Sequence, residues 1–421
     1  MSDVTRPTHH RWGAEERREA VSDTRTGPLA GLKVVELAQW VFVPSAAAIL
    51  ADLGADVVRI EHPVHGDPYS ALTTAGADNG ASAQSARSAQ ANRGKRSVGI
   101  DLTRAGGREL AYTLIREADA FLTSFRTDAL DRLGMSRAHL APLNPGLVYA
   151  RGDAFGPDGP DSALPGYDIT AFWARGGVGA LVTDPDASQV ARQPPSFGDR
   201  IASVGLACGV MASLLGRERG AEPAPVSSSL MAAAAWVTAS EIISHDPSAG
   251  PGARVAMPPM TGSYRCAGGG WIMLNLMQGD RYWDDFCKHI GAPELRLDER
   301  FADGAGRGAH AAELRAALET VFARRTRDEW SAAFATFDGP WAPVQDVTEL
   351  AEDPQIVANG FVRPVPEIEG MRLVRAPFTV GEVPETLPRG PELGEHTESV
   401  LLDAGLGWDE IERLKDAGVV T

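Results

Sequence analysis

The chain opens with two short apolar runs rich in β-branched residues, separated by an alanine-rich stretch. Residues 32–37 and 56–60 fit buried strands, and residues 45–53 between them predict a helix. A strand, a helix and a second strand in this order form a βαβ unit, whose strands are parallel. Further strands are predicted at 119–125 and 147–150. The sequence therefore predicts an α/β fold with a Rossmann-like parallel sheet.

The pattern changes after a cluster of proline and glycine between residues 246 and 262. Beyond it, residues 263–266 and 271–274 flank a run of glycines as a β-hairpin, and Thr326 and Glu329 form a capping box that starts a helix. At 421 residues the chain exceeds what one hydrophobic core usually organises, so two domains are expected. The predicted parts, in order, are a mobile N-terminal tail (1–27), the first part of a large α/β domain (28–245), a linker (246–262), a small α+β domain (263–343) and a segment that returns to the large domain (344–421).

Charge and cysteine content narrow the class of protein. The chain has 56 acidic and 40 basic side chains, and its formal charge of −16 would repel nucleic acid and anionic membranes over most of the surface. Cys208, Cys266 and Cys287 show no C-x-x-C spacing and are typical of reduced core thiols. The N-terminal residues are polar and contain no apolar targeting segment. We therefore expect a cytoplasmic protein that binds neither nucleic acid nor membranes.

Several common catalytic motifs are missing from the sequence. The loop after the first strand, residues 38–44, has no glycine, so the dinucleotide fingerprint G-x-G-x-x-G is absent where it would have to be. Gly94-Lys95 lacks the earlier glycine of a phosphate-binding P-loop, and no serine has a G-x-S-x-G context. His62 and His65 have no further histidine or cysteine nearby to complete a zinc site. An enzyme with this sequence would use carboxylates and no metal.

The stretch 194–201 contains the best candidate for such a carboxylate. Asp199 precedes an apolar helix predicted at 202–217, where the positive end of the helix dipole favours an ionised carboxylate. An ionised aspartate at this place can act as a nucleophile, or it can simply cap the helix. The local sequence leaves both interpretations open.

Seven motifs occur in an order that matches one known family. They are 48–61 (AILADLGADVVRIE) followed by Gly66-Asp67, 92–97 (NRGKRS), 131–134 (DRLG), 165–168 (PGYD), Gly198-Asp199, 353–355 (DPQ) and 393–397 (LGEHT). This set resembles the landmarks of the class III CoA-transferases, also called the CaiB/BaiF or formyl-CoA transferase family. The resemblance runs from about residue 28 to the C-terminus.

The resemblance implies the chemistry and assembly of that family. Asp199 matches the aspartate nucleophile, which attacks an acyl-CoA donor to give a mixed anhydride and then an aspartyl-CoA thioester. An acceptor carboxylic acid reverses these steps. One thioester is exchanged for another, so CoA enters as a substrate and no tightly bound cofactor is implied. The resemblance also implies an interlocked homodimer.

Two alternatives remain beside this interpretation. The α-methylacyl-CoA racemases carry a catalytic histidine where this chain has Tyr167, and a phenol with a pKa of about 10 is a poor base. A non-catalytic CoA-binding subunit of a heteromeric transferase would lack the Gly198-Asp199 pair, which is intact here. Next to Tyr167, Asp168 either orients the substrate or caps the helix that follows it.

The resemblance also assigns residues to CoA and to the acyl group. The CoA-binding candidates are Arg59, His62 near the adenine, Lys95 and Arg96 near the phosphates, and Phe125 and Arg132 in the following strand and helix. Val41 stands where oxalate-specific members carry glutamine. Trp40, Phe42 and Trp173 near the expected acyl pocket favour a bulkier or more apolar acid.

Overall fold

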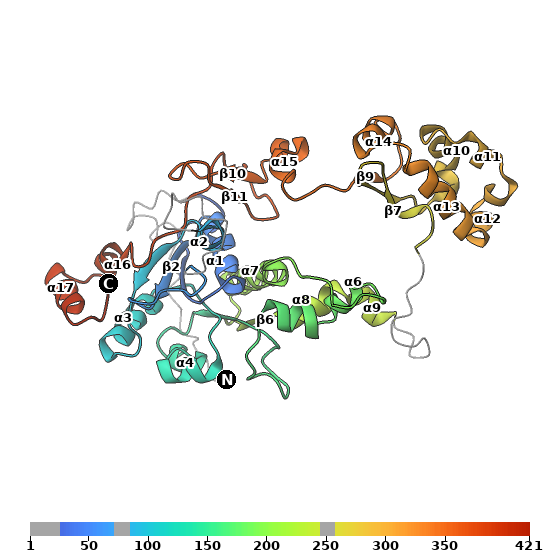
Figure 1. Ribbon diagram of the computed structural model, residues 1–421. Helices are drawn as coiled ribbons and strands as arrows, with labels where there is room; N and C mark the ends of the chain where they lie inside the picture. The colour runs from blue at the N-terminus through green and yellow to red at the C-terminus, as the bar shows by residue number, and fades with distance from the viewer. Residues whose placement is uncertain (1–25, 71–84, 245–256) are drawn as a thin grey trace, which may run out of the picture. The chain divides into compact units, whose positions relative to one another are not determined.

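The computed structural model of the protein describes residues 26–70, 85–244 and 257–421 (Figure 1). The chain divides into two compact units, Met1–Asp246 with Asn359–Thr421, and Pro247–Ala358. Residues 344–358, which we predicted as part of the return segment, therefore belong to the second unit. Most of the predicted tail and linker lies outside the described residues.

A six-stranded parallel sheet forms the centre of the first unit, with the strand order β3-β2-β1-β4-β5-β6. This is the doubly wound order of Rossmann folds, and its switch point lies between β1 and β4, where the direction of winding reverses. The predicted α/β fold with a Rossmann-like sheet is confirmed. The strands are β1 (Lys33–Leu37), β2 (Asp56–Glu61), β3 (Arg96–Gly99), β4 (Ala120–Thr123), β5 (Val148–Asp153) and β6 (Val226–Ser229).

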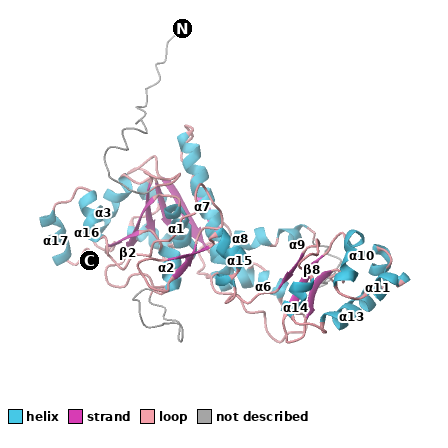
Figure 2. Ribbon diagram, turned by 90° about the horizontal axis from the view of Figure 1, so that it is seen from above, coloured by secondary structure: helices cyan, strands magenta, loops and turns pink. Residues whose placement is uncertain are grey.

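Helices cover both faces of this sheet (Figure 2). Successive side chains of a strand point to opposite faces, so Val34 packs with α1 and α7 while Val35 packs with α3, α16 and α17. The helices of this unit are α1 (Phe42–Asp52), α2 (Ala86–Asn92), α3 (Ala105–Arg116), α4 (Thr127–Leu133), α5 (Arg137–Leu140), a π-helix (Ile169–Arg175), α6 (Val178–Val182), α7 (Phe197–Glu218), α8 (Leu230–Val237), α9 (Ala239–Ile243), α16 (Thr397–Asp403) and α17 (Trp408–Asp416). A hairpin of β10 (Val362–Pro364) and β11 (Arg372–Val374) lies in the return segment.

Helix α7 is long and apolar enough to cross a membrane, judged by length and composition alone. Its residues Leu206 and Val210 are fully buried in the core that α7 shares with α1 and the sheet. The apolar character of α7 is therefore explained by packing within the first unit.

The apolar run 230–243 suggests a core segment, but much of it is exposed. Leu230 and Ala234 are buried, but Trp236 and Ile243 are 81% and 84% exposed. The two short helices α8 and α9 divide this run, and only one side of α8 contacts the π-helix and α7. A run that is apolar all round has no periodicity to show which side is buried, so the sequence could not reveal the exposed side.

The second unit has a three-stranded antiparallel sheet of order β7-β8-β9. The predicted hairpin is confirmed, with Gly268 and Gly269 at positive φ in its turn, and so is the capping box of Thr326 and Glu329. The elements are β7 (Thr261–Arg265), β8 (Trp271–Asn275), β9 (Trp341–Pro343), α10 (Gly279–His289), α11 (Pro293–Leu297), α12 (Gly304–Ala309), α13 (Ala311–Phe322), α14 (Arg327–Ala333) and α15 (Pro354–Asn359), with 3₁₀ turns at Glu299–Phe301 and Leu350–Glu352.

Candidate active site

Asp199 lies in the first turn of α7 but does not cap that helix. The N-cap position is Ser196, in a left-handed conformation with φ of 59°, and its side chain makes no capping hydrogen bond. The cap comes from Asp168, whose two carboxylate oxygens each accept the backbone N–H of Gly198 at 3.1 Å. The interpretation of Asp199 as a helix cap is therefore wrong. Asp168, in turn, caps α7 and not the helix that follows it in the chain.

The Gly198-Asp199 pair has a steric explanation. A Cβ atom at Gly198 would overlap with the Asp168 carboxylate and with the ring of Phe172. Only glycine lets the first turn of α7 approach these two residues so closely. Gln193 completes the arrangement, because its side-chain amide donates to Asp168 at 2.7 Å. The sequence gives no sign of this role for Gln193, which lies in a loop outside any recognisable motif.

Burial changes the charge state of Asp199. The pKa of Asp199 is raised from 3.8 to about 7, first by burial and then by the neighbouring charge of Asp168, while Arg200 opposes the shift. Burial also raises the pKa of Asp168, although Gln193 and the N–H groups of α7 act in the opposite direction. The helix dipole is expected to favour the ionised form of Asp199, but desolvation acts against it and raises the pKa.

We expect activity that depends on ionised Asp199 to rise with pH. Below about 7, kcat/KM should increase roughly tenfold per pH unit, and it should level off above that value. An Asp168→Asn variant removes the like charge but keeps an oxygen acceptor for Gly198, so its profile should shift to lower pH. Steady-state rates between pH 5 and 9 test both expectations, and a flat profile would contradict the first.

The raised pKa also means that ionised Asp199 lowers the stability of the folded protein at neutral pH. Between 3.8 and about 7 the folded protein holds a proton at Asp199 that the unfolded chain releases. The contribution of this residue to stability therefore falls as pH rises through that range. A carboxylate that lowers stability in its ionised form is typical of a functional site.

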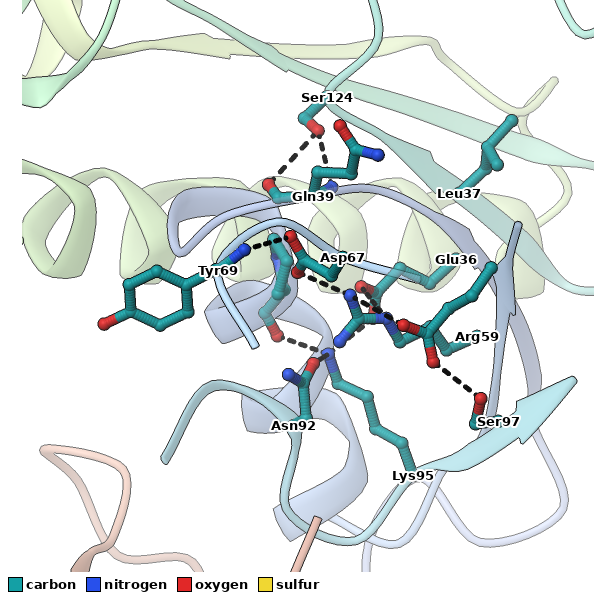
Figure 3. Close-up of polar contacts among 12 residues, drawn as sticks. Glu36, Leu37, Gln39, Arg59, Asp67, Tyr69, Asn92, Lys95, Ser97 and Ser124 are labelled. Carbon is teal, nitrogen blue, oxygen red and sulfur yellow. Dashed lines mark hydrogen bonds and ion pairs between the residues drawn. The ribbon is translucent and has the colours of Figure 1, made fainter. Parts of the chain in front are cut away.

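A second group of charged residues forms a buried network at the ends of β1, β2 and β3 (Figure 3). Lys95 donates to Glu36 at 2.5 Å, to the carbonyl of Pro44 at 2.8 Å and to Asn92 at 3.0 Å, and its side chain is 0% exposed. All three ammonium hydrogens are therefore used inside the protein. The prediction that Lys95 binds the CoA phosphates is wrong for this conformation, because the ammonium offers no further donor.

Arg59 belongs to the same network. Its guanidinium lies 2.6 Å from Asp67, 3.4 Å from Glu61 and 3.9 Å from Glu36, and the side chain is buried. Burial lowers the pKa of Arg59, but the three carboxylates outweigh it and raise the pKa above its ordinary value. The arginine is therefore a permanent positive charge that holds three acidic side chains together.

A cavity of about 200 Å³ opens where β1, β2 and β4 end. This is the switch point of the sheet, the place where doubly wound folds bind their ligands. The cavity brings together three of the predicted CoA-binding residues, Arg59, His62 and Phe125. The His62 ring stacks on His65 at 4.6 Å, and its Nδ1 accepts the backbone N–H groups of residues 64 and 65.

The other two basic candidates do not line this cavity. Arg96 pairs with Asp56 at 2.5 Å and with Asp403 at 2.7 Å. Arg132 lies on the exposed side of α4 and pairs with Asp128 at 3.0 Å. In the described part of the chain, no group of three histidine, cysteine, aspartate or glutamate side chains could hold a metal ion.

The predicted acyl-pocket aromatics separate into two groups. Phe42 and Trp173 are buried in the core between the sheet and α7, and the Trp173 indole donates to the carbonyl of Ala191. Trp40 is partly exposed and packs edge-on against Tyr167, with ring centroids 5.0 Å apart. Only Trp40 of the three is therefore placed beside a predicted site residue.

Comparison with known proteins identifies the family of this chain. The sequence profile of CoA-transferase family III matches residues 29–397. The chain belongs to CoA-transferase family III. A CAIB/BAIF family protein from Brucella suis has the same fold, with a TM-score of 0.77 and 28% identity over 90% of this chain and 99% of that one.

Two curated relatives of this CoA-transferase cover almost its whole length. The (R)-2-hydroxy-4-methylpentanoate CoA-transferase of Clostridioides difficile is 30% identical over 93% of this chain and 99% of its own. The cinnamoyl-CoA:phenyllactate CoA-transferase of Clostridium sporogenes is 29% identical over 93% and 97%. The motifs therefore identified the family correctly, and the chain is an enzyme of the CoA-transferase class.

Proposed function

We propose that this CoA-transferase moves CoA from an acyl-CoA donor to a free carboxylic acid through covalent adducts on Asp199. An Asp199 oxygen attacks the thioester carbon, the C–S bond breaks, and a mixed anhydride and CoA thiolate result. The thiolate attacks the aspartyl carbon, the donor acid leaves as a carboxylate, and Asp199 carries CoA as a thioester. The acceptor carboxylate then displaces the thiolate, which attacks the acceptor's acyl carbon and regenerates Asp199.

One observation carries this proposal. Asp199 stands in the first turn of α7 without serving as its cap, because Asp168 binds the Gly198 N–H instead. The helix keeps its structure whether Asp199 is a carboxylate, an anhydride or a thioester. Each adduct forms through a tetrahedral intermediate, whose oxyanion backbone N–H groups can stabilise.

We place the adenosine part of CoA in the switch-point cavity. His62 and Phe125 offer ring faces there, and the strand ends that form the cavity provide backbone groups. Lys95 takes no direct part, because Glu36, Pro44 and Asn92 already use its ammonium. No tightly bound cofactor is part of the proposal.

The proposal extends to assembly and location. We propose a homodimer, which the exposed apolar side chains of α8 and α9, such as Trp236 and Ile243, support. We also propose a cytoplasmic enzyme, since Cys208, Cys266 and Cys287 are all free thiols.

Trapping of the adducts tests the mechanism. The enzyme is incubated with an acyl-CoA panel, treated with hydroxylamine or borohydride, and digested for mass spectrometry. We expect the hydroxamate or alcohol on Asp199 and on no other residue. A label on another residue would overturn the assignment of Asp199. Exchange of the donor's α-hydrogen without CoA transfer would overturn the proposal in favour of the racemase alternative.

A further inference from the structure

Trp40 has an unusual backbone conformation. It lies in the loop between β1 and α1, with a φ of +69°, and shares a positive φ with only one other non-glycine residue of the described chain, Ser196. For a large side chain the left-handed region is strained, so surrounding contacts must hold it there. Such strain is concentrated at functional sites, so the contacts that keep Trp40 in this conformation bear on function.

Asp67 supplies those contacts. Both of its carboxylate oxygens accept the backbone N–H of Trp40 at 3.2 Å, and one also accepts the N–H of Tyr69 at 3.0 Å. The carboxylate is itself fixed by Arg59 at 2.6 Å, and Figure 3 shows it between Arg59 and Tyr69. One buried side chain therefore sets the backbone positions of two aromatic residues that are far apart in sequence.

The two aromatic residues form a surface together with a third. The Trp40 ring lies 5.0 Å from Tyr167 and 6.4 Å from Tyr69, measured between ring centroids. Trp40 and Tyr69 are partly exposed, and Tyr167 is 56% exposed. We call these three residues the aromatic wall. Exposed rings in contact with one another provide apolar area that a ligand can cover.

Two separate connections place the aromatic wall beside Asp199. Tyr167 precedes Asp168, whose carboxylate binds the N–H of Gly198. On the other side, Tyr69 is close enough to Arg200 to oppose the lowering of its pKa by burial. Both connections end at a residue adjacent to Asp199 in α7.

We propose that Asp67 positions the aromatic wall so that the Asp199 site selects acids with an aryl or bulky branched side group. This inference rests on the proposed function, because it names the acids that Asp199 would carry. Aromatic faces stabilise apolar and aryl groups through contact area and stacking. Asp67 is a positioning residue, since it acts through the backbone of Trp40 and Tyr69.

Trp40→Gly provides the most direct test. It removes the ring and, because glycine accepts a positive φ, it also relieves the backbone strain, so the protein should fold. The measurement is kcat/KM for 3-phenylpropanoyl-CoA and for propanoyl-CoA with one common acceptor. The wild-type enzyme should prefer the aryl donor, and the variant should lose that preference by about 10–100-fold. Trp408→Ala, at an exposed tryptophan of α17, should leave the ratio unchanged.

Asp67→Asn tests the positioning role. Loss of the charge weakens the contact with Arg59 and the double acceptance of the Trp40 N–H, so KM for the aryl donor should rise while kcat changes little. A variant that loses activity equally toward both donors would show that Asp67 does not act through the aromatic wall. If Asp67→Asn fails to fold, Trp40→Gly still tests whether the aromatic wall sets the donor preference.

The outcomes separate this inference from the proposed function. Suppose that Asp199 is labelled in the trapping experiment, but the wild-type enzyme shows no aryl preference or Trp40→Gly leaves the ratio of kcat/KM values unchanged. Then the role of the aromatic wall is overturned and the proposed function stands. Absence of any label on Asp199 with either donor overturns the proposed function as well.

Discussion

Replacing Asp199 with asparagine should lower the rate of CoA transfer by at least about 10⁴-fold, in line with the loss of other essential nucleophiles. The amide has nearly the shape of the carboxylate but is not a nucleophile. It need not disturb the fold, because Asp168 caps α7 and Asp199 does not. The variant should therefore unfold at the wild-type temperature or above it, since a partly buried charge beside Asp168 is removed.

The measurement is initial rates of acyl-CoA formation with the best donor and acceptor. Asp409→Asn is a matched control, because Asp409 also occupies the first turn of a helix, α17, and should leave the rate unchanged. An Asp199→Asn enzyme that turns over at the wild-type rate would remove the basis for the covalent mechanism.

Replacing Lys95 with methionine should destabilise the first unit by about 3–5 kcal/mol. The change leaves Glu36, which is fully buried on β1, without the cation that lies 2.5 Å from it. Burying the charge of Lys95 already costs free energy: burial lowers its pKa to about 8, even though Glu36 opposes the shift. In the variant Glu36 keeps only the more distant Arg59, at 3.9 Å, and a buried carboxylate that loses its hydrogen-bonded cation is strongly destabilising.

Chemical unfolding of two further variants serves as a control for Lys95→Met. Glu36→Gln/Lys95→Met removes both charges and should recover most of the lost stability. Lys33→Met breaks an exposed pair with Glu117 and should cost less than about 1 kcal/mol. If Lys95→Met leaves stability unchanged but greatly raises KM for acyl-CoA, the structural role is contradicted. Lys95 would then be a CoA-binding residue.

The comparison of Lys95 with His62 shows why some site residues could be predicted and others could not. Lys95 lies in a motif that the family shares and His62 directly follows another, so the resemblance marks both as candidates. Only the fold shows that Lys95 points into the network of Glu36 and Arg59, while His62 lines a cavity at the switch point. Burial and partners depend on residues far away in sequence, so spacing alone cannot separate a structural cation from a ligand contact.

Asp168 gives the same lesson for local structure. Its sequence position predicts a cap for the helix that follows, because capping propensity describes residues a few positions apart. In the structure, Asp168 caps α7 by accepting the backbone N–H of Gly198, which lies 30 residues further along the chain. Gln193 was missed for the same reason, and Asp67 was identified only as part of a family motif, because its contact with Trp40 forms only after folding.

The sequence by itself determined the doubly wound α/β fold, the hairpin and capping box of the second unit, the family, and Asp199 as the candidate nucleophile. Each of these depends on local periodicity, on turn chemistry or on a contiguous motif. The tertiary structure alone decided that Asp199 is protonated more readily than an ordinary aspartate, that Lys95 is structural, and that Trp40 is held in a strained conformation by Asp67. These properties arise from desolvation and from contacts between distant segments, which exist only once the chain has folded.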